Sequence, residues 1–183
     1  MRNKAREILH SEIGVFAAIR LCLQKKCISS AIALAYSAID VLSWLAMPAN
    51  KFEVTRQDFI SWADQYVVPG SSLDCSGTDL YGARCGIVHT LTPVSRMSQE
   101  GRAMPIAYSW GNQPPYRREH LERLGVQWLM LHVETLCDAV EQGASRFWDE
   151  VEKDNARLDL INKRADLLIR PAPELPPDLS PFV

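Results

Sequence analysis

Arg84 and His89, in the segment GTDLYGARCGIVHTLTP, have side chains that could act together on an anionic group. A guanidinium stabilises negative charge, and an imidazole can take up or release a proton near neutral pH. Pro93 should end a helix that runs from about Thr78 to Leu91. Side chains five residues apart on a regular helix differ in direction by about 140°. The spacing alone is therefore poor geometry for two groups that act on one phosphate.

The predicted helix has an inward side and a small-residue side. Arg84 lies on the apolar side and should point toward the core, whereas Gly82 and Gly86 lie on the opposite side with His89. Each glycine costs up to about 1 kcal/mol relative to alanine inside a helix. This cost predicts that another backbone or a ligand approaches closely there, with His89 at the edge of a shallow groove.

The acidic partner expected for Arg84 lies in an earlier helix. Ile28 to Met47 form an apolar run of 20 residues in which Asp40 is the one charged side chain. Tyr36, Asp40 and Ser43 have the i, i+4, i+7 spacing of a single stripe. Because an unpaired buried carboxylate is costly, a cation should meet Asp40, and Arg84 is the obvious candidate.

The same run has nearly the length of a membrane-spanning helix. A central aspartate is costly in a bilayer, and the alanines and serines of this run contribute little apolar transfer energy. A buried core helix is therefore expected, with no membrane partner.

Composition indicates an ordinary globular chain of 183 residues with a formal net charge of −2. That charge argues against a protein coated with positive charge for non-specific nucleic-acid binding, although a local basic cleft stays open. The cysteines are five, scattered, and without a CxxC pair, which argues against a disulfide framework and a structural zinc site. No cofactor or metal ligand set is evident, and the start of the chain does not resemble a signal peptide, so the cytoplasm is the expected location.

The element pattern predicts an all-α fold, a bundle of about five or six helices in a single domain over residues 1–170. Residues 171–183 are rich in proline and should form an extended tail. The expected helices are Lys4 to Gln24, Ile28 to Met47, a short one that Thr55 and Asp58 cap, Thr78 to Leu91, and a long helical region after Tyr116 in which Gly143 marks a kink or join. An irregular excursion, with a possible short hairpin, is expected from Val94 to Pro115.

The segment RCGIVH, together with the upstream helix AYSAIDVL, resembles the HEPN family of helical domains. That family is marked by an arginine, four to six intervening residues and a histidine, here Arg84 and His89 around CGIV, with an acidic helix upstream in which Asp40 has the matching place. The resemblance covers roughly residues 5–92 and, more loosely, the long helix after Tyr116. Active members often have a polar residue after the arginine, where this chain has Cys85.

The resemblance implies a metal-independent endoribonuclease that works as a homodimer. Two motif helices would pack through Gly82 and Gly86, so that Arg84 and His89 of both copies reach each phosphate. His89 would take the proton of a 2′-hydroxyl, and Arg84, oriented by Asp40, would stabilise the phosphorane. Such enzymes serve as toxins, often with an antitoxin protein, in phage defence or in RNA processing.

Weaker candidates for contacts with RNA lie beside the motif. Tyr81 flanks the motif helix and could contact a base. Arg96 and Arg102 could bind the strand by charge, and Tyr108 and Trp110 by stacking. Exposed loop charges and packed aromatic side chains are the plainer interpretation of these residues.

Two other functions stay open. A non-catalytic HEPN-like module would bind nucleic acid, a nucleotide or a protein, for example a nucleotidyltransferase antitoxin. A structural helical dimer would use Arg84 and Asp40 as a core ion pair and His89 as a capping residue. The enzyme requires Arg84 and His89 to reach a common site that is open to solvent.

Overall fold

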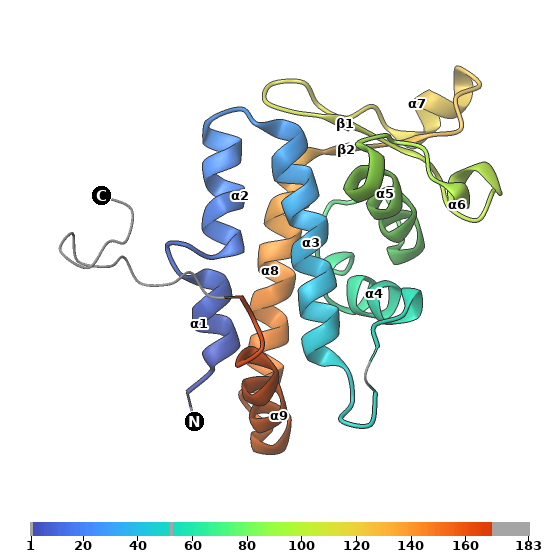
Figure 1. The fold of residues 1–183 in the computed structure, drawn as a ribbon. Helices are drawn as coiled ribbons and strands as arrows, with labels where there is room; N and C mark the ends of the chain where they lie inside the picture. Colours follow the sequence, from blue (N-terminus) through green and yellow to red (C-terminus); the bar gives the residue numbers. More distant parts are fainter. Residues whose placement is uncertain (1, 52, 170–183) are drawn as a thin grey trace, which may run out of the picture.

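Helices α2 (Val15–Gln24), α3 (Ile28–Ala46) and α8 (Val133–Val151) run side by side and enclose the core of the computed structural model, which describes residues 2–51 and 53–169 (Figure 1). Small residues of α3, including Ala31, Ala35 and Ala38, are fully buried, so neighbouring helices pack closely against it. The all-α prediction is confirmed as a mostly helical fold, to which a small parallel sheet is added.

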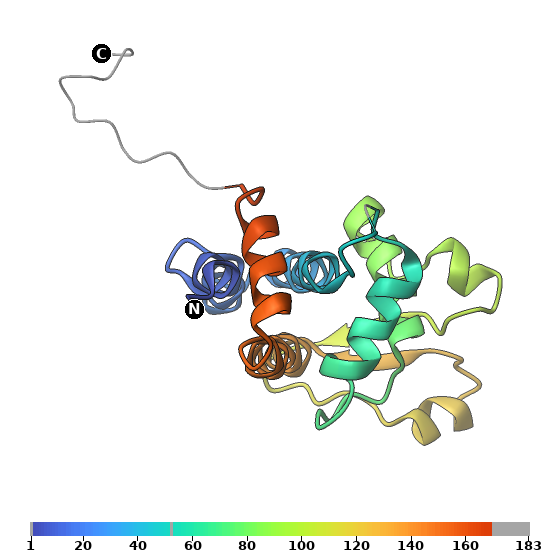
Figure 2. The same cartoon turned by 90° about the horizontal axis from the view of Figure 1, so that it is seen from below.

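The predicted first helix is in fact two helices, α1 (Lys4–His10) and α2, separated at Gly14. Gly14 is the N-cap of α2, and a side chain there would collide with the carbonyl oxygens of Ile8 and Leu9. Helix α9 (Asn155–Ala165) packs against α1 and lies across the lower end of the bundle (Figures 1 and 2). The continuous-helix prediction was wrong because apolar periodicity carries on through this short break.

Helix α4 (Arg56–Trp62) begins where the sequence predicts, with the Asp58 carboxylate accepting a hydrogen bond from the Thr55 N–H at 2.6 Å. It continues into a π-helical turn, η1 (Ala63–Val67), that packs on α8. Gly143 sits inside an uninterrupted α8 and marks no kink. Its Cβ would lie 2.6 Å from the Tyr66 carbonyl oxygen, so the glycine permits the contact between α8 and η1.

Helix α5 (Gly77–Thr90) carries the Arg/His motif and is fixed at its N-terminus by Asp79. This buried carboxylate accepts the Ser76 N–H at 3.0 Å in a capping box, and its second oxygen accepts the Met104 N–H at 2.7 Å. The short helix α6 (Arg96–Gln99) comes next in the chain, and Met104 follows it. Asp79 therefore links α5 to the segment just after α6.

Strands β1 (Ile106–Ser109) and β2 (Leu129–His132) form the two-stranded sheet, and helix α7 (Arg118–Arg123) lies in the connection between them. The strands are parallel, with Ile106 opposite Leu129, so the possible hairpin in 94–115 was a wrong prediction. The expected long helix after Tyr116 is also interrupted, because Leu129 belongs to β2, which leads directly into α8. The proline-rich tail, 171–183, lies outside the described residues.

By length and composition α3 could cross a membrane. In this fold half of its 18-residue apolar window is buried against other helices. The contacts with α2, α4, α5, α8 and α9 place it at the centre of the domain, as a core helix.

Candidate functional site

Asp40 on α3 and Arg84 on α5 form the ion pair that the sequence predicts. The Nε of Arg84 donates a hydrogen bond to Oδ2 of Asp40 at 2.8 Å. The side chain of Arg84 is 22% exposed and that of Asp40 is 24% exposed, so the pair sits at the edge of the core and not within it. The inward direction expected for Arg84 is confirmed.

The ionisation of this pair is shaped by partial burial. Burial raises the pKa of Asp40, and the hydrogen bond and charge of Arg84 oppose this rise without cancelling it. Burial would lower the pKa of Arg84, but the hydrogen bond and charge of Asp40 outweigh it and raise that pKa. The guanidinium therefore stays charged, and burial raises the pKa of Asp40 more than Arg84 lowers it.

His89 meets Arg84 within the same helix. The Nη1 of Arg84 lies 3.3 Å from Nε2 of His89, which is an exposed residue in the last turn of α5. Because a guanidinium only donates hydrogen bonds, Nε2 can bond to it only as an acceptor. The geometric objection from helix periodicity was wrong, since the long arginine side chain spans the angle between the two positions.

The turn after α5 fixes the position of His89. Leu91 ends the helix in the left-handed region, with φ of 54°, and its N–H bonds back to Ile87. The hydroxyl of Thr90 donates to the Gly86 carbonyl oxygen at 2.8 Å and lies 2.9 Å from the hydroxyl of Thr92. These bonds hold the last helical turn against the segment that follows it.

Gly82 and Gly86 are both buried by the chain's own residues. A Cβ on Gly82 would lie 2.7 Å from that of Ala103, and one on Gly86 would collide with the Thr92 carbonyl oxygen. The predicted close approach of another backbone is confirmed, but the predicted dimer face through these glycines is wrong because residues 92–103 already cover it. The exposed apolar side chains near His89 are instead Val88, Leu91 and Val94, which are 37%, 64% and 37% exposed.

Tyr81 lies on the flank of the site, half-buried, with its ring against Phe59 at 5.4 Å between centroids. Burial and the neighbouring Cys85 thiol raise the pKa of Tyr81, and the charges of Arg84 and Arg56 lower it. Arg56, at the start of α4, is thus a second cation close to the site. Sequence reasoning missed Arg56, although its position directly after the predicted cap at Thr55 places it at the start of a helix.

The remaining predicted RNA contacts are not gathered at this site. Arg96 and Arg102 are both ion-paired with Glu100, at 2.6 Å and 2.5 Å, so one carboxylate is shared by two exposed cations. Tyr108 is half-buried, and its hydroxyl lies 2.7 Å from that of Tyr36, so part of this side chain is packed inside the fold. Trp110 is 53% exposed and stays available.

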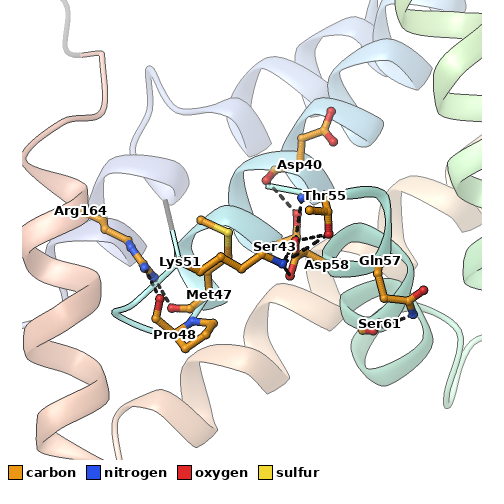
Figure 3. A network of polar contacts seen from close by, with 10 residues as sticks. All are labelled: Asp40, Ser43, Met47, Pro48, Lys51, Thr55, Gln57, Asp58, Ser61 and Arg164. Atoms are coloured by element: carbon orange, nitrogen blue, oxygen red, sulfur yellow. Dashed lines mark hydrogen bonds and ion pairs between the residues drawn. The ribbon is translucent and has the colours of Figure 1, made fainter. Parts of the chain in front are cut away.

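A separate polar cluster lies at the C-terminal end of α3 (Figure 3). Lys51 pairs with Asp58, and Arg164 donates to backbone carbonyls of residues that follow α3, including Pro48 at 2.9 Å. The hydroxyl of Ser43 donates to the Asp40 carbonyl oxygen at 2.9 Å, while the Asp40 carboxylate points away from the cluster. The Asp40 carboxylate, which bonds to Arg84, therefore belongs to a different network from the pair of Lys51 and Asp58.

Over residues 2–51 and 53–169 no group of three or more His, Cys, Asp or Glu side chains is placed to hold a metal ion. What the arrangement at α5 offers is a cation held by a carboxylate, beside an imidazole at the surface. Such a pair can bind an anionic group and accept a proton next to it.

No family model, no curated protein and no solved structure matches this chain.

Proposed function

We propose that the chain is an HEPN-like, metal-independent endoribonuclease with Arg84 and His89 as its catalytic residues and Asp40 as the residue that positions Arg84. The observation that carries this proposal is the 3.3 Å approach of the Arg84 guanidinium to Nε2 of the exposed His89. The 2.8 Å hydrogen bond from Nε of Arg84 to Asp40 holds the same guanidinium in place. A phosphate that reaches the pair meets a cation and a proton acceptor together.

In the proposed reaction an RNA phosphate takes the place of His89 as the partner of the Arg84 Nη1. The freed Nε2 lone pair of His89 then accepts the proton of the adjacent 2′-hydroxyl. The 2′ oxygen attacks phosphorus, the bond from phosphorus to the 5′ oxygen breaks, and the departing oxygen takes a proton from solvent. The products are a 2′,3′-cyclic phosphate and a 5′-hydroxyl, with Arg84 stabilising the charge on the phosphorane.

Tyr81 and Arg56 extend the site on its flank, and we propose that they contact the RNA beside the scissile phosphate. A homodimer also stays part of the proposal, through a surface other than the glycine face, which residues 92–103 cover. Toxin activity with an antitoxin partner, phage defence and RNA processing are the duties that fit such an enzyme in the cytoplasm.

The test is cleavage of labelled tRNA and mixed RNA in EDTA by the parent protein and by His89→Gln. Glutamine keeps an oxygen that can accept the Arg84 hydrogen bond but cannot take a proton at neutral pH. Cleavage by the variant should fall at least about 100-fold, the lower end of the loss expected for a general base. Because His89 is exposed, the melting temperature should stay within a few degrees.

Equal cleavage by the parent protein and His89→Gln would rule out His89 as the base. An intact parent protein that binds RNA and cuts none under any condition would favour the non-catalytic module. A light-scattering mass of one chain at micromolar concentration would remove the homodimer from the proposal.

A further inference from the structure

A cavity of about 720 Å³ lies between strand β2 and the loop of residues 111–118, and neither Arg84 nor His89 lines it. Its lining includes Tyr116, Arg117, Arg118, Met130 and His132. This volume is within the range of about 300–1,000 Å³ that is typical of small-ligand sites. The cavity therefore has room for a ligand that the proposed catalytic pair does not use.

A second hollow of about 290 Å³ adjoins the first, since Pro114, Tyr116 and Met130 line both. We call it the aromatic hollow, because Tyr108, Trp110 and Tyr116 contribute to its lining. Trp110 is 53% exposed and Tyr116 is 58% exposed, and the Tyr116 ring stacks on His120 at 5.5 Å between centroids. Exposed rings held at a fixed place can stack on a planar ligand.

The loop over these hollows is fixed at both ends. Near its start the Gly111 N–H donates to the Glu134 carboxylate at 3.0 Å, and the Gly111 carbonyl oxygen lies 3.0 Å from Nε2 of His132. At its end Arg118 lies 3.4 Å from the Asp74 carboxylate and donates to the Asp74 carbonyl oxygen. The hollows are therefore largely formed before a ligand arrives.

Ser109 lines the aromatic hollow, and its hydroxyl is buried and lacks a partner. The residue is only 7% exposed, and within the described part of the chain its Oγ has no hydrogen-bond partner. A buried hydroxyl without a partner is unfavourable, because it has lost its hydrogen bonds to water and gained none in return. A ligand that carries hydrogen-bonding groups on a flat ring would satisfy it.

Arg117 lines the larger cavity with a charge that the protein does not neutralise. Among the residues that the structure describes, none forms an ion pair or a hydrogen bond with the Arg117 guanidinium, whereas its neighbour Arg118 is paired with Asp74. An anionic group on the ligand would supply the missing partner. The larger cavity is also lined by two acidic residues, Asp74, which is paired with Arg118, and Glu119, so the place for an anion is at Arg117. A planar ring with polar edges joined to an anion is the chemistry of a nucleotide.

We propose that the two hollows bind one unpaired nucleotide of an RNA strand, with the base in the aromatic hollow and its phosphate at Arg117. The choice of RNA over a free nucleotide rests on the function proposed for Arg84 and His89. The base stacks on Tyr116 and Trp110 and bonds through its edge to Ser109. Because a base inside a duplex is already stacked and paired, the site selects single strands.

The experiment measures binding of a fluorescent, fully 2′-O-methylated RNA 12-mer, which cannot be cut because it lacks the 2′ nucleophile. Tyr116→Ala and Arg117→Ala should each raise the dissociation constant about tenfold, as expected for loss of one stacking platform or one phosphate contact. Arg117→Ala should also reduce the slope of log affinity against log salt by about 0.7. Arg20→Ala, which removes an exposed cation paired with Glu141 on α8, is the matched control and should bind as the parent does.

Ser109→Ala separates a binding role from a structural one. It removes a buried hydroxyl without a partner, so its melting temperature should not fall, while the ranking of the four homopolymeric 12-mers should change. A lower melting temperature with an unchanged ranking would mean that Ser109 supports the fold and not the base.

Unlabelled mononucleotide and duplex of the same sequence complete the test as competitors. Weak competition by both supports a site for a single strand, whereas strong competition by the mononucleotide overturns the proposal in favour of a free-nucleotide site. Unchanged binding in both Tyr116→Ala and Arg117→Ala overturns it outright. Tyr116-dependent binding in a protein that cuts no RNA would contradict the endoribonuclease and leave this site standing.

Discussion

Two arginines reach helix α3, and the protein holds them in different ways. Arg164 lies past the C-terminal end of α3, where its guanidinium donates to the carbonyl oxygens of Leu45, Met47 and Pro48 (Figure 3). Arg84 reaches the middle of the helix, where its Nε bonds to the Asp40 carboxylate and its Nη1 faces His89. Arg164 is 9% exposed as a residue, and the Arg84 side chain is 22% exposed.

The difference shows how one cation can be bonded to backbone carbonyls alone while another is paired with a carboxylate and keeps a nitrogen at the surface. Arg164 donates its hydrogen bonds to backbone carbonyl oxygens, and in the described part of the chain no carboxylate lies at ion-pair distance from it. Burial accordingly lowers its pKa. Arg84 has its charge balanced by Asp40 and still presents a nitrogen at the surface, where a substrate anion can replace His89.

Substitution of Arg84 should have the largest effect. Arg84→Ala removes the group that stabilises the phosphorane, so RNA cleavage should fall about 10²–10³-fold, equivalent to about 2.7–4 kcal/mol of transition-state stabilisation. Initial rates of the parent protein and the variant, at equal concentrations of folded protein, measure the loss. Cleavage within a few-fold of the parent rate would place Arg84 in the same structural class as Arg164.

Arg164→Met should give the opposite pattern. Three carbonyl oxygens lose their donor at the end of α3, and the unfolding free energy should fall by about 2 kcal/mol. Urea unfolding measures this loss, and the cleavage rate per folded molecule should match that of the parent. A variant that keeps full stability would show that solvent satisfies these carbonyl groups as well as Arg164 does.

Leu91→Gly should stabilise the protein by about 1 kcal/mol, because Leu91 ends α5 with φ of 54° and glycine adopts this conformation without steric cost. Thermal unfolding is the measurement. Gly101→Ala is the matched control in the opposite sense, since it adds a side chain at φ of 67°, with open space around it, and should destabilise. A lower melting temperature in Leu91→Gly would mean that the exposed leucine makes contacts in solution, as a dimer through this surface would require.

The smallest expected effect is a difference in how two aspartates respond to pH. Burial raises the pKa of Asp40 above 3.8, so the folded state binds this proton more tightly than the unfolded state does. The Asp40 contribution to the unfolding free energy therefore declines as pH rises from 3.8 through the folded-state pKa. Partial burial would raise the pKa of Asp58 too, but hydrogen bonds from Lys51 and Thr55 lower it. Its contribution is present above 3.8 and is lost as pH falls through the lower folded-state pKa.

Urea unfolding of the parent protein, Asp40→Asn and Asp58→Asn, from about pH 3 to about pH 7, measures both slopes. The parent should lose stability relative to Asp40→Asn as pH rises just above 3.8. The parent should gain stability relative to Asp58→Asn as pH rises toward 3.8 from the acid side. Slopes of the same sign in the two comparisons would show that Asp40 is not held in a half-buried pair with Arg84.

Local sequence signals predicted the elements that carry the site. The apolar run with one aspartate gave α3, and the Thr55 and Asp58 pattern gave the start of α4. The pairing of Asp40 with Arg84 followed from the cost of leaving a carboxylate unpaired in a core. These predictions succeeded because each depends on a few residues and a strong energetic penalty.

Features that depend on distant contacts could not be predicted in the same way. Strand β2 is defined by its pairing with β1, yet the spacing of Leu129, Val133 and Leu136 is also that of a helix face. The angle between positions 84 and 89 on a regular helix predicts that Arg84 and His89 point in different directions. It does not take into account the length of the arginine side chain, which reaches His89. The glycines did mark a close approach, but only the fold reveals that residues 92–103 make it.

The most direct test of the Arg84 and His89 pair is the chemistry of the cut ends. An RNA cleaved in EDTA at a mapped site would be compared, by mass spectrometry of the products, with the same RNA carrying a single 2′-deoxy nucleotide just before the cut. We predict a 2′,3′-cyclic phosphate and a 5′-hydroxyl from the first RNA and no cleavage at that site in the second. A 5′-phosphate product, or undiminished cleavage at the deoxy position, would contradict the proposed role of His89.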